Sequence, residues 1–436
     1  MEISHECSEH LRARFDAMVR AAVDELVECV VEPSASAAEV EKQLAGRMRT
    51  LGSKMIADGL SARLGAHRGR QVCRCWSVME HEGSRSRQVM TVLGRGAYRR
   101  AYYRCPSCEE TLYAGDREIG IAQTGYTLPA QELVALVSAE LPFDSTCRHL
   151  VRLTGIDVSA KQCQRISALH GEQVERASAA ERTALFEGRL GYLAAGRGAR
   201  LYVTLDATKT HLTDGWHETK LGAVYDVKPD RHGNDTPGQT SYTASVRESV
   251  EQFGQRLYQE ACCRGVERVA EVIAVADGAP WIWNLVAEHF PGARQVLDYY
   301  HAAQRLYDVA RVVYGEHSVE GLAWAETGCG LLLESEVDAV LSRLQALQPE
   351  GASGQDAVRL ALGYYEANRG RMRYKELTEA GCHIGSGVIE AGCKTVVGAR
   401  CKRSGMNWST AGAAHVLALR SILLSQRWDQ YWQHAA

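Results

Sequence analysis

The chain of 436 residues lacks long apolar runs, a signal-like start and an excess of charge of either sign. No apolar stretch reaches the roughly 18 residues that a membrane helix needs, so we expect no membrane partner. The first residues, MEISHECSEHLRARF, are charged rather than signal-like, and we therefore expect a cytoplasmic protein. Without a secretory signal, the 14 cysteines favour free thiols or metal ligands over a disulfide framework.

The near balance of charge, 50 basic against 53 acidic side chains, counts mildly against a nucleic-acid partner. The local distribution of charge points the other way. Six arginines and no acid lie between Arg85 and Arg104, and eight basic residues against three acidic ones lie between Arg369 and Arg403. Because charge runs are usually solvated faces, these two stretches give modest support to DNA binding.

Three separated carboxylates stand where a fold would present them. Asp206 and Asp277 each follow a short apolar run rich in β-forming residues, LYVTL and VIAVA. Functional groups protrude into a crevice at strand ends in α/β sheets, so we expect both aspartates to line a site. Glu390 follows a Gly-Ser-Gly turn in which Ser386 is a good N-cap, which predicts a place in the first turns of a helix.

Carboxylates in this pattern suggest metal-dependent phosphoryl transfer. Phosphodiester chemistry needs a deprotonated water or hydroxyl, an oxyanion leaving group and charge compensation, which two Mg²⁺ roughly 4 Å apart supply. Mg²⁺ prefers carboxylate oxygens and keeps several waters. Taken singly, each acid also has an ordinary explanation. Asp277 precedes a turn glycine, Asp206 can open a loop, and Glu390 suits the positive end of a helix.

Further motifs accompany the acids over nearly the whole chain: TLDATKT, ETKLGAVYDV, VIAVADGAPWIWNLVAEHFP, QVLDYYHAAQRLYDVA and HIGSGVIEAGCKTVVGARCKRSGMNWS. In this order they resemble a bacterial insertion-sequence transposase of the DDE type, most like the ISKra type. The resemblance implies an RNase H-like core with Asp206, Asp277 and Glu390 as the acidic triad. The DYYH motif, from Asp298 to His301, resembles the D-x-x-H signature of related transposases that carry a helical insertion before the final glutamate.

Asp298 and His301 also have an interpretation from the residues alone. The run QVLDYYH again places an acid at the end of an apolar stretch, and His301 can hydrogen-bond a metal cluster or the DNA backbone. The alternative is an interior histidine capped by an aspartate. We favour a supporting role for both residues, because three carboxylates already complete a metal site. Trp408 can stack on a flipped or splayed base, although a core position is the commoner role of a tryptophan.

A small zinc-ribbon-like module is expected from four cysteines that flank β-like segments, Cys73, Cys75, Cys105 and Cys108. The C-x-x-C spacing of the second pair is a good half site for tetrahedral Zn²⁺. The first pair has C-x-C spacing, whereas related transposases usually show two knuckles of the longer spacing. His81 can substitute for one cysteine, and a β-hairpin module with reduced cysteines and no metal is the alternative.

The next segment has a helix-turn-helix pattern. LPFDSTCRHLVRLTG predicts a short helix, GIDVS a turn with Gly155 and the N-cap Ser159, and AKQCQRISALHGEQVERA the second helix. The first turns of the second helix carry side chains suited to base edges, Lys161, Gln162, Gln164 and Arg165. An ordinary helical hairpin explains the pattern about equally well. The position between a ribbon and a catalytic domain favours binding of the element's terminal repeats.

The chain divides into six expected sections. They are a helical leader at 1–68, the zinc-ribbon-like module at 69–125, the helix-turn-helix region at 126–197, the first part of the core at 198–300, an all-helical insertion at 301–380, and the rest of the core with the catalytic helix at 381–436. The leader breaks at Pro33 and has one apolar face, with Leu11, Phe15, Met18 and Val19. We interpret it as a leader or dimerisation element.

Alternating strand and helix signals in the section 198–300 predict a mixed or parallel sheet covered by helices. The section 301–380 is expected to be nearly all helical, with the segments VDAVLSRLQAL and DAVRLALGYYEANRGRMRY separated by a loop from Pro349 to Gly354. Such an insertion explains why more than a hundred residues separate Asp277 from Glu390.

Together these features predict an α/β enzyme, a DDE transposase that cleaves and transfers DNA strands with Mg²⁺ or Mn²⁺ and holds Zn²⁺ in its ribbon. We expect the basic segment around Glu390 to contact DNA through Lys394, Arg400, Lys402 and Arg403. Synapsis of two element ends makes a homo-oligomer the expected form. Two alternatives remain, a catalytically retired DNA-binding regulator and a structure-selective nuclease without strand transfer.

Overall fold

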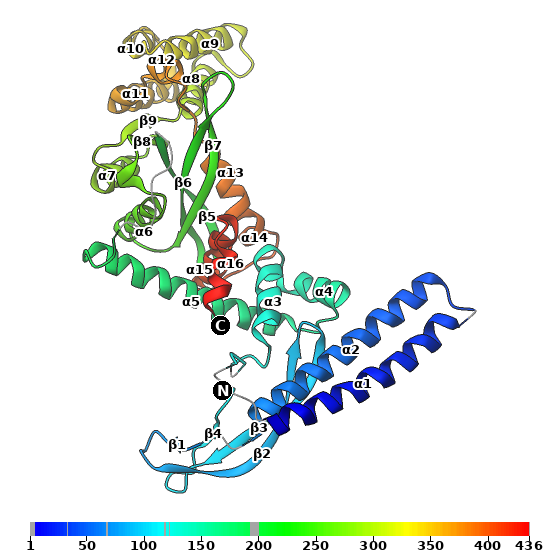
Figure 1. Ribbon diagram of the computed structural model, residues 1–436. Coiled ribbons are helices and arrows are strands. Elements are labelled where there is room, and N and C mark those ends of the chain that lie inside the picture. Colours follow the sequence, from blue (N-terminus) through cyan, green and yellow to red (C-terminus); the bar gives the residue numbers. More distant parts are fainter. Residues whose placement is uncertain are drawn as a thin grey trace. The chain divides into compact units, whose positions relative to one another are not determined.

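The computed structural model contains two compact units, residues Met1–His170 with Gln430–Ala436 and residues Gly171–Asp429. The structure describes residues 5–32, 34–66, 69–116, 119–121, 123–191 and 200–435 (Figure 1). Pro33 and the predicted section boundaries near residues 68 and 197 lie outside the described residues. Among the helices described, none combines the length and the apolar character needed to cross a membrane.

Two long helices open the first unit, α1 (His5–Val31) and α2 (Ala37–Leu64), and they pack on each other. Ser36 caps α2, because its side chain accepts the N–H of Glu39 and its own N–H donates to the Glu39 carboxylate at 2.8 Å. Most of the predicted apolar face of α1 is half-buried, namely Leu11, Phe15 and Met18. The prediction is wrong for Val19, which is 41% exposed, since one further residue turns the side chain by about 100°.

Four strands form the antiparallel sheet of the first unit, in the order β1-β2-β3-β4. Their bounds are β1 (Gln71–Val72), β2 (Val78–Thr91), β3 (Gly94–Arg104) and β4 (Thr111–Tyr113). Helix α2 lies against β3, and Gly96 permits the approach: a Cβ there would come within 2.8 Å of the Ala57 side chain. The helices that follow are α3 (Leu128–Glu140), α4 (Phe143–Thr154) and α5 (Ala160–Phe186), and α16 (Trp428–His434) ends the described chain.

The second unit is built on a mixed sheet of five strands in the order β7-β6-β5-β8-β9. Their bounds are β5 (Arg200–Leu212), β6 (Gly215–Pro229), β7 (Asp235–Val246), β8 (Glu271–Ala276) and β9 (Arg294–Leu297). The first three strands are antiparallel, whereas β8 runs parallel to β5 and β9 runs parallel to β8. Of the two predicted arrangements, a mixed or a parallel sheet, the structure therefore has the mixed one.

Helices cover both faces of this sheet, α6 and α7 on one side and α13 and α15 on the other (Figure 1). Their bounds are α6 (Val250–Cys263), α7 (Pro280–His289), α13 (Gly387–Gly392) and α15 (Thr410–Leu424). Two neighbouring residues of β6 distinguish the faces, since side chains alternate along a strand. A Cβ on Gly222 would meet Leu257 of α6, whereas Leu221 contacts Gly392 of α13.

Between β9 and α13 the chain is helical and lies at one end of the sheet (Figure 1). The helices are α8 (Tyr299–Tyr314), α9 (Val319–Leu333), α10 (Val337–Gln345), α11 (Gly351–Asn368), a 3-10 turn η2 (Arg369–Arg371) and α12 (Tyr374–Glu379). The predicted loop from Pro349 to Gly354 is too long, because α11 already begins at Gly351 and Gly354 packs against Pro349.

Candidate metal sites and nucleic-acid surface

Asp206 and Asp277 occupy equivalent positions on two parallel neighbouring strands. The last paired residues of β5 and β8 are Thr204 and Val275, and each aspartate lies two residues further on. Two residues along a strand return to the same face, and neighbouring strands are about 4.8 Å apart. The sequence predicted that Asp206 ends its strand, and this prediction is wrong. Strand β5 continues to pair with β6 as far as Leu212, beyond the point where its pairing with β8 ends.

The electrostatics of Asp206 reflect this placement. Burial raises the pKa of its carboxyl, the N–H of Ala207 at 2.6 Å works in the opposite direction, and the negative charge of Asp277 adds to the rise. Asp277 itself accepts the N–H of Ala279 at 2.9 Å. Both carboxylates are half-buried and repel each other, and a divalent cation bound between such groups would relieve the repulsion.

Asp298 continues the row of aspartates, because it follows Leu297, the partner of Ala276 in the pair of β8 and β9. It is fully buried and caps α8. One carboxylate oxygen accepts the N–H of His301 at 2.9 Å, and the other accepts the N–H of Ser386. Burial by itself would raise the pKa of Asp298, but the hydrogen bonds from His301 and Ser386 outweigh it and leave the pKa below the ordinary value.

Hydrogen bonds to Asp298 and its neighbour bring the chain before α13 against the start of α8. Ser386 binds Asp298, and the carbonyl of Ile384 accepts the N–H of Tyr299 at 2.9 Å. Ser386 was predicted as an N-cap; it does occupy that position, but its side chain makes no capping hydrogen bond. Its backbone N–H contributes the contact instead.

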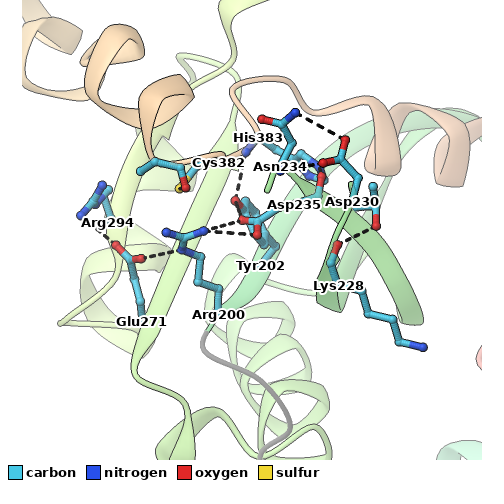
Figure 2. A network of polar contacts seen from close by, with 12 residues as sticks. Arg200, Tyr202, Lys228, Asp230, Asn234, Asp235, Glu271, Arg294, Cys382 and His383 are labelled. Atoms are coloured by element: carbon cyan, nitrogen blue, oxygen red, sulfur yellow. Dashed lines mark hydrogen bonds and ion pairs between the residues drawn. The ribbon is translucent and has the colours of Figure 1, made fainter. Parts of the chain in front are cut away.

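A polar network holds the same segment from the other side (Figure 2). The N–H of His383 donates to the Tyr202 hydroxyl at 3.0 Å, and that hydroxyl donates to Asp235 at 2.7 Å. Arg200 pairs with Asp235 at 3.2 Å and with Glu271 at 3.1 Å. The start of β5, the start of β7 and the segment leading into α13 are therefore tied together.

These contacts place Glu390 next to Asp298. Ligand atoms of Asp298, His301 and Glu390 all lie within 4.8 Å of one another. The hydrogen bond to Asp298 raises the pKa of His301, burial opposes the rise, and the charges of Asp298, Asp277 and Glu390 add to it. Glu390 and the two predicted supporting residues thus lie together at the ends of β8 and β9. Among the described residues this group does not include Asp206 or Asp277, whose carboxylates act on it as nearby charges.

Cys393 is a further member of the site that sequence reasoning missed. Its thiol donates to the Asp206 carboxylate at 3.6 Å, and burial followed by the charge of Asp206 raises the pKa of the thiol to about 12. The signal in the sequence was its spacing of three residues after Glu390, which places two side chains on the same side of a helix. Lys402 also reaches strand β5, where it donates to the Thr208 hydroxyl.

The four predicted zinc ligands form a second candidate site, at the end of the first unit's sheet. The sulfur atoms of Cys73, Cys75, Cys105 and Cys108 all lie within 4.8 Å of one another. Cys73 and Cys108 are 3.4 Å apart, and Cys75 and Cys105 are 3.5 Å apart. A tetrahedral Zn²⁺ with Zn–S bonds of about 2.3 Å separates its sulfurs by about 3.8 Å. The cluster can therefore hold a metal such as zinc.

The C-x-C spacing closes this site because both cysteine turns end in the same backbone conformation. Trp76 and Glu109 each follow the second cysteine of their turn and have φ of 69° and 60°. The N–H of Trp76 returns to the Cys73 carbonyl at 2.9 Å, and the N–H of Glu109 returns to Cys105 at 3.0 Å. His81 instead contacts Tyr103, with the two rings tilted by 52°, and it does not belong to the cysteine cluster of the described residues.

A family model described as "Uncharacterised protein family (UPF0236)" matches residues 35–426. The chain belongs to this family. The matched range includes both candidate metal sites and the helix-turn-helix segment of this UPF0236 protein. No curated protein sequence matches the chain.

The helix-turn-helix geometry of this UPF0236 chain agrees with the pattern of its residues. Gly155 ends α4 with φ of 75°, and the Ser159 hydroxyl accepts the N–H of Gln162 at 3.2 Å at the start of α5. Three of the predicted DNA-contacting side chains are exposed there, Lys161, Gln164 and Arg165. Gln162 instead donates to the Thr124 carbonyl at 3.0 Å, so it holds the fold of the segment. Binding of DNA by this helix stays a prediction.

Arg400 and Trp408 are buried, contrary to their predicted role at a DNA surface. Arg400 is 1% exposed and lies over the Trp408 ring at 4.7 Å, and Trp408 is 8% exposed. Burial lowers the pKa of Arg400 to about 10. Because the cation packs on the indole inside the unit, neither side chain offers a surface to a nucleic acid. The other predicted cations of the segment are exposed, Lys394, Lys402 and Arg403.

The arginines between residues 85 and 104 of this UPF0236 member are partly neutralised within their own sheet. Arg87 and Arg100 both pair with the buried Asp116. Arg104 pairs with Glu109 at 3.2 Å. The local basic excess seen in the sequence therefore overstates the charge that this face presents.

Proposed function

We propose that this protein is a DDE transposase, which binds the ends of an insertion sequence and catalyses DNA strand cleavage and strand transfer. The observation that carries the proposal is the equivalent position of Asp206 and Asp277 on adjacent parallel strands, with Glu390, more than a hundred residues later, close enough for its charge and that of Asp277 to act on His301. Sites of paired carboxylates of this kind suit phosphodiester chemistry.

The order of the sheet supports an RNase H-like core for the second unit. Three antiparallel strands followed by two parallel ones, with helices on both faces, accord with the fold that the resemblance implies. The helices from α8 to α12 fit the helical insertion expected before the final glutamate. We infer an ISKra-type arrangement on these grounds.

The proposed cofactor is Mg²⁺ or Mn²⁺, and the donor set fits it. Hard oxygen ligands are what these cations prefer. Burial and the charge of Asp277 both raise the pKa of Asp206, so a cation at this place would compensate negative charge that is poorly solvated. Asp206, Asp277 and Glu390 would hold the ions. A bound pair would supply Lewis acidity, which would lower the pKa of the attacking water or 3′-hydroxyl and balance the charge on the leaving oxygen.

The surrounding residues have roles that follow from their contacts. Asp298 uses both carboxylate oxygens on backbone N–H groups, so it positions α13 and its glutamate. His301, with its raised pKa, retains a proton to higher pH and places a cationic donor beside the acids. A phosphate oxygen at the site is the natural acceptor for that donor.

DNA-end recognition is assigned to the first unit. Lys161, Gln164 and Arg165 are exposed on the first turns of α5, where a recognition helix meets base edges. The cysteine cluster would hold Zn²⁺ and stabilise the sheet. Synapsis of two ends implies a homo-oligomer acting on element and target DNA.

The proposal is tested by strand cleavage of DNA carrying the flanking ends of the encoding element, with Mg²⁺ or Mn²⁺. Asp206→Asn, Asp277→Asn and Glu390→Gln should each abolish cleavage while end binding persists. Asp356→Asn is the matched control, because Asp356 is 65% exposed and its one ion pair in the described part of the chain is with Arg359, three residues away in α11.

Each other outcome points to a different function. Binding without cleavage in the wild type would indicate a catalytically retired regulator. Cleavage without joining of the 3′-hydroxyl to target DNA would indicate a structure-selective nuclease. Cleavage that survives all three substitutions would remove the carboxylate site from the mechanism.

A further inference from the structure

A charged hollow lies at the end of strand β9 opposite Asp298. Its volume is about 450 Å³, and its lining includes Arg294, Arg371, Arg373 and a single acid, Glu376. Three guanidinium groups against one carboxylate leave a formal charge of +2. Arg294 begins β9, whereas Asp298 follows the end of that strand, so this arginine hollow is distinct from the carboxylate site.

Arg371 is held rigidly at the wall of the arginine hollow. Its Nε donates to Gln295 at 2.7 Å, and its Nη1 donates to the Ala367 carbonyl and to Asn368, both at 3.0 Å. The guanidinium lies over the Trp283 ring at 4.6 Å. These contacts fix the plane of the group, so little side-chain entropy remains to be lost when it binds a ligand.

Every acceptor that Arg371 has in the described part of the chain is neutral. No carboxylate pairs with it there, and burial lowers its pKa. Both N–H groups of its Nη2 have no partner among the described residues. A half-buried cation without a counter-charge is costly, and the cost is offset when an anion with two oxygens accepts from the fork.

The two other arginines are only partly neutralised. Arg294 pairs with Glu271 at 2.8 Å, but Figure 2 shows that Glu271 also pairs with Arg200. Arg373 is 70% exposed and stands 3.9 Å from Glu376, a distance at which the attraction through water is weak. The positive charge of the arginine hollow is therefore available to a ligand.

We propose that the arginine hollow binds a phosphate group carried by a nucleotide. Planar guanidinium forks match phosphate oxygens in pairs, and the volume is that of a small-molecule site rather than of a bare ion. The phosphate belongs either to a free mononucleotide or to one unit of a nucleic-acid strand. The proposal goes beyond the transposase function and does not depend on it, since it concerns binding at a separate site.

The first test uses the full-length wild-type chain and needs no variant. Arginines are labelled with phenylglyoxal, and the extent of labelling is measured by mass spectrometry alone and with inorganic phosphate, thymidine monophosphate or a ten-nucleotide oligothymidylate. Arg371 and Arg373 should be protected at least about threefold by a nucleotide ligand. Arg359 is the internal control, because it is 69% exposed and pairs with an acid three residues away, as Arg373 does.

The ligands distinguish the two sources. Protection by the mononucleotide at millimolar concentration identifies a free nucleotide site, and protection by the oligonucleotide alone identifies the backbone of a strand. Equal protection of Arg359, or no protection by any ligand, overturns the proposal.

A matched pair of variants provides a second readout. Arg373→Ala should weaken binding of the protecting ligand about tenfold, and Arg359→Ala should change it less than about twofold. With the oligonucleotide, Arg373→Ala should also reduce the slope of log affinity against log salt by about 1. Equal affinities and equal slopes for the two variants would contradict the assignment.

Discussion

The buried carboxylate of Asp298 accepts the backbone N–H of Ser386, a residue 88 positions further along the chain. This bond joins the first residue after β9 to the turn that precedes Glu390. The helices from α8 to α12 lie between these two residues in the chain. A second hydrogen bond, from the N–H of Tyr299 to the carbonyl of Ile384, closes the same segment. These two hydrogen bonds, where the helical segment begins and ends, therefore set the position of Glu390.

Asp298→Asn tests the contribution of these hydrogen bonds to stability. The amide nitrogen would face one of two backbone N–H donors, so we expect the second unit to lose about 1–3 kcal/mol of unfolding free energy. Because the folded pKa of Asp298 lies below 3.8, its stabilising contribution is complete above that pH and is lost as the pH falls below it. Urea unfolding at several pH values measures both effects. Asp308→Asn is the control, since Asp308 is on the same helix and 45% exposed.

The same substitution should act on His301. Its pKa is raised first by the hydrogen bond to Asp298, so Asp298→Asn should lower the pKa of the imidazole. A titration of the His301 ring protons by NMR measures the shift. An unchanged His301 pKa in a folded Asp298→Asn variant would show that the histidine does not depend on this carboxylate.

Glu390→Gln separates catalysis from binding. It removes one negative charge from the site and keeps the side-chain size, so cleavage of element ends should fall at least about 100-fold while affinity for the same DNA stays within about twofold. Gel-based cleavage and equilibrium binding on one substrate measure both. Parallel loss of binding and cleavage would point to a structural role for Glu390.

The cysteine cluster predicts a metal content. The purified chain should carry about one Zn²⁺, and Cys105→Ser should lower that content and the unfolding temperature of the first unit. Elemental analysis and calorimetry, with and without a chelator, measure the two quantities. Cys7→Ser in α1 is the control, since Cys7 lies outside the cluster. If the wild type contains no zinc and its unfolding temperature is the same with and without chelator, the cysteine cluster is not a zinc site.

Arg165 and Gln162 separate a DNA contact from a structural one. Arg165 is exposed, so Arg165→Ala should weaken binding of element ends by about 1–3 kcal/mol without changing the unfolding temperature. Gln162 donates a hydrogen bond to the Thr124 carbonyl, so Gln162→Ala should lower the free energy of unfolding by about 1 kcal/mol. Binding and melting curves for both variants are compared with Arg176→Ala, an exposed change further along α5. Equal DNA affinities for Arg165→Ala and Arg176→Ala would exclude the recognition-helix role.

Several features could be predicted because they depend on short stretches of sequence. The apolar runs before Asp206 and Asp277 indicated strands, and the left-handed turn at Gly155 with the cap at Ser159 followed from local chemistry. The four cysteines could be grouped because few roles suit that residue pattern without a secretory signal. Local hydrogen bonding and side-chain periodicity act within a few residues, so they are readable in order along the chain.

Other features were decided only when distant segments packed together. The sheet order placed Asp298 beside Asp277. The return of the chain at Ser386 brought Glu390 to Asp298 and Cys393 to Asp206, and Arg400 was buried against Trp408. The arginine hollow likewise joins β9 to a turn more than 70 residues later. These outcomes depend on which surfaces exclude water and which charges find partners in three dimensions, and that information belongs to the packed fold.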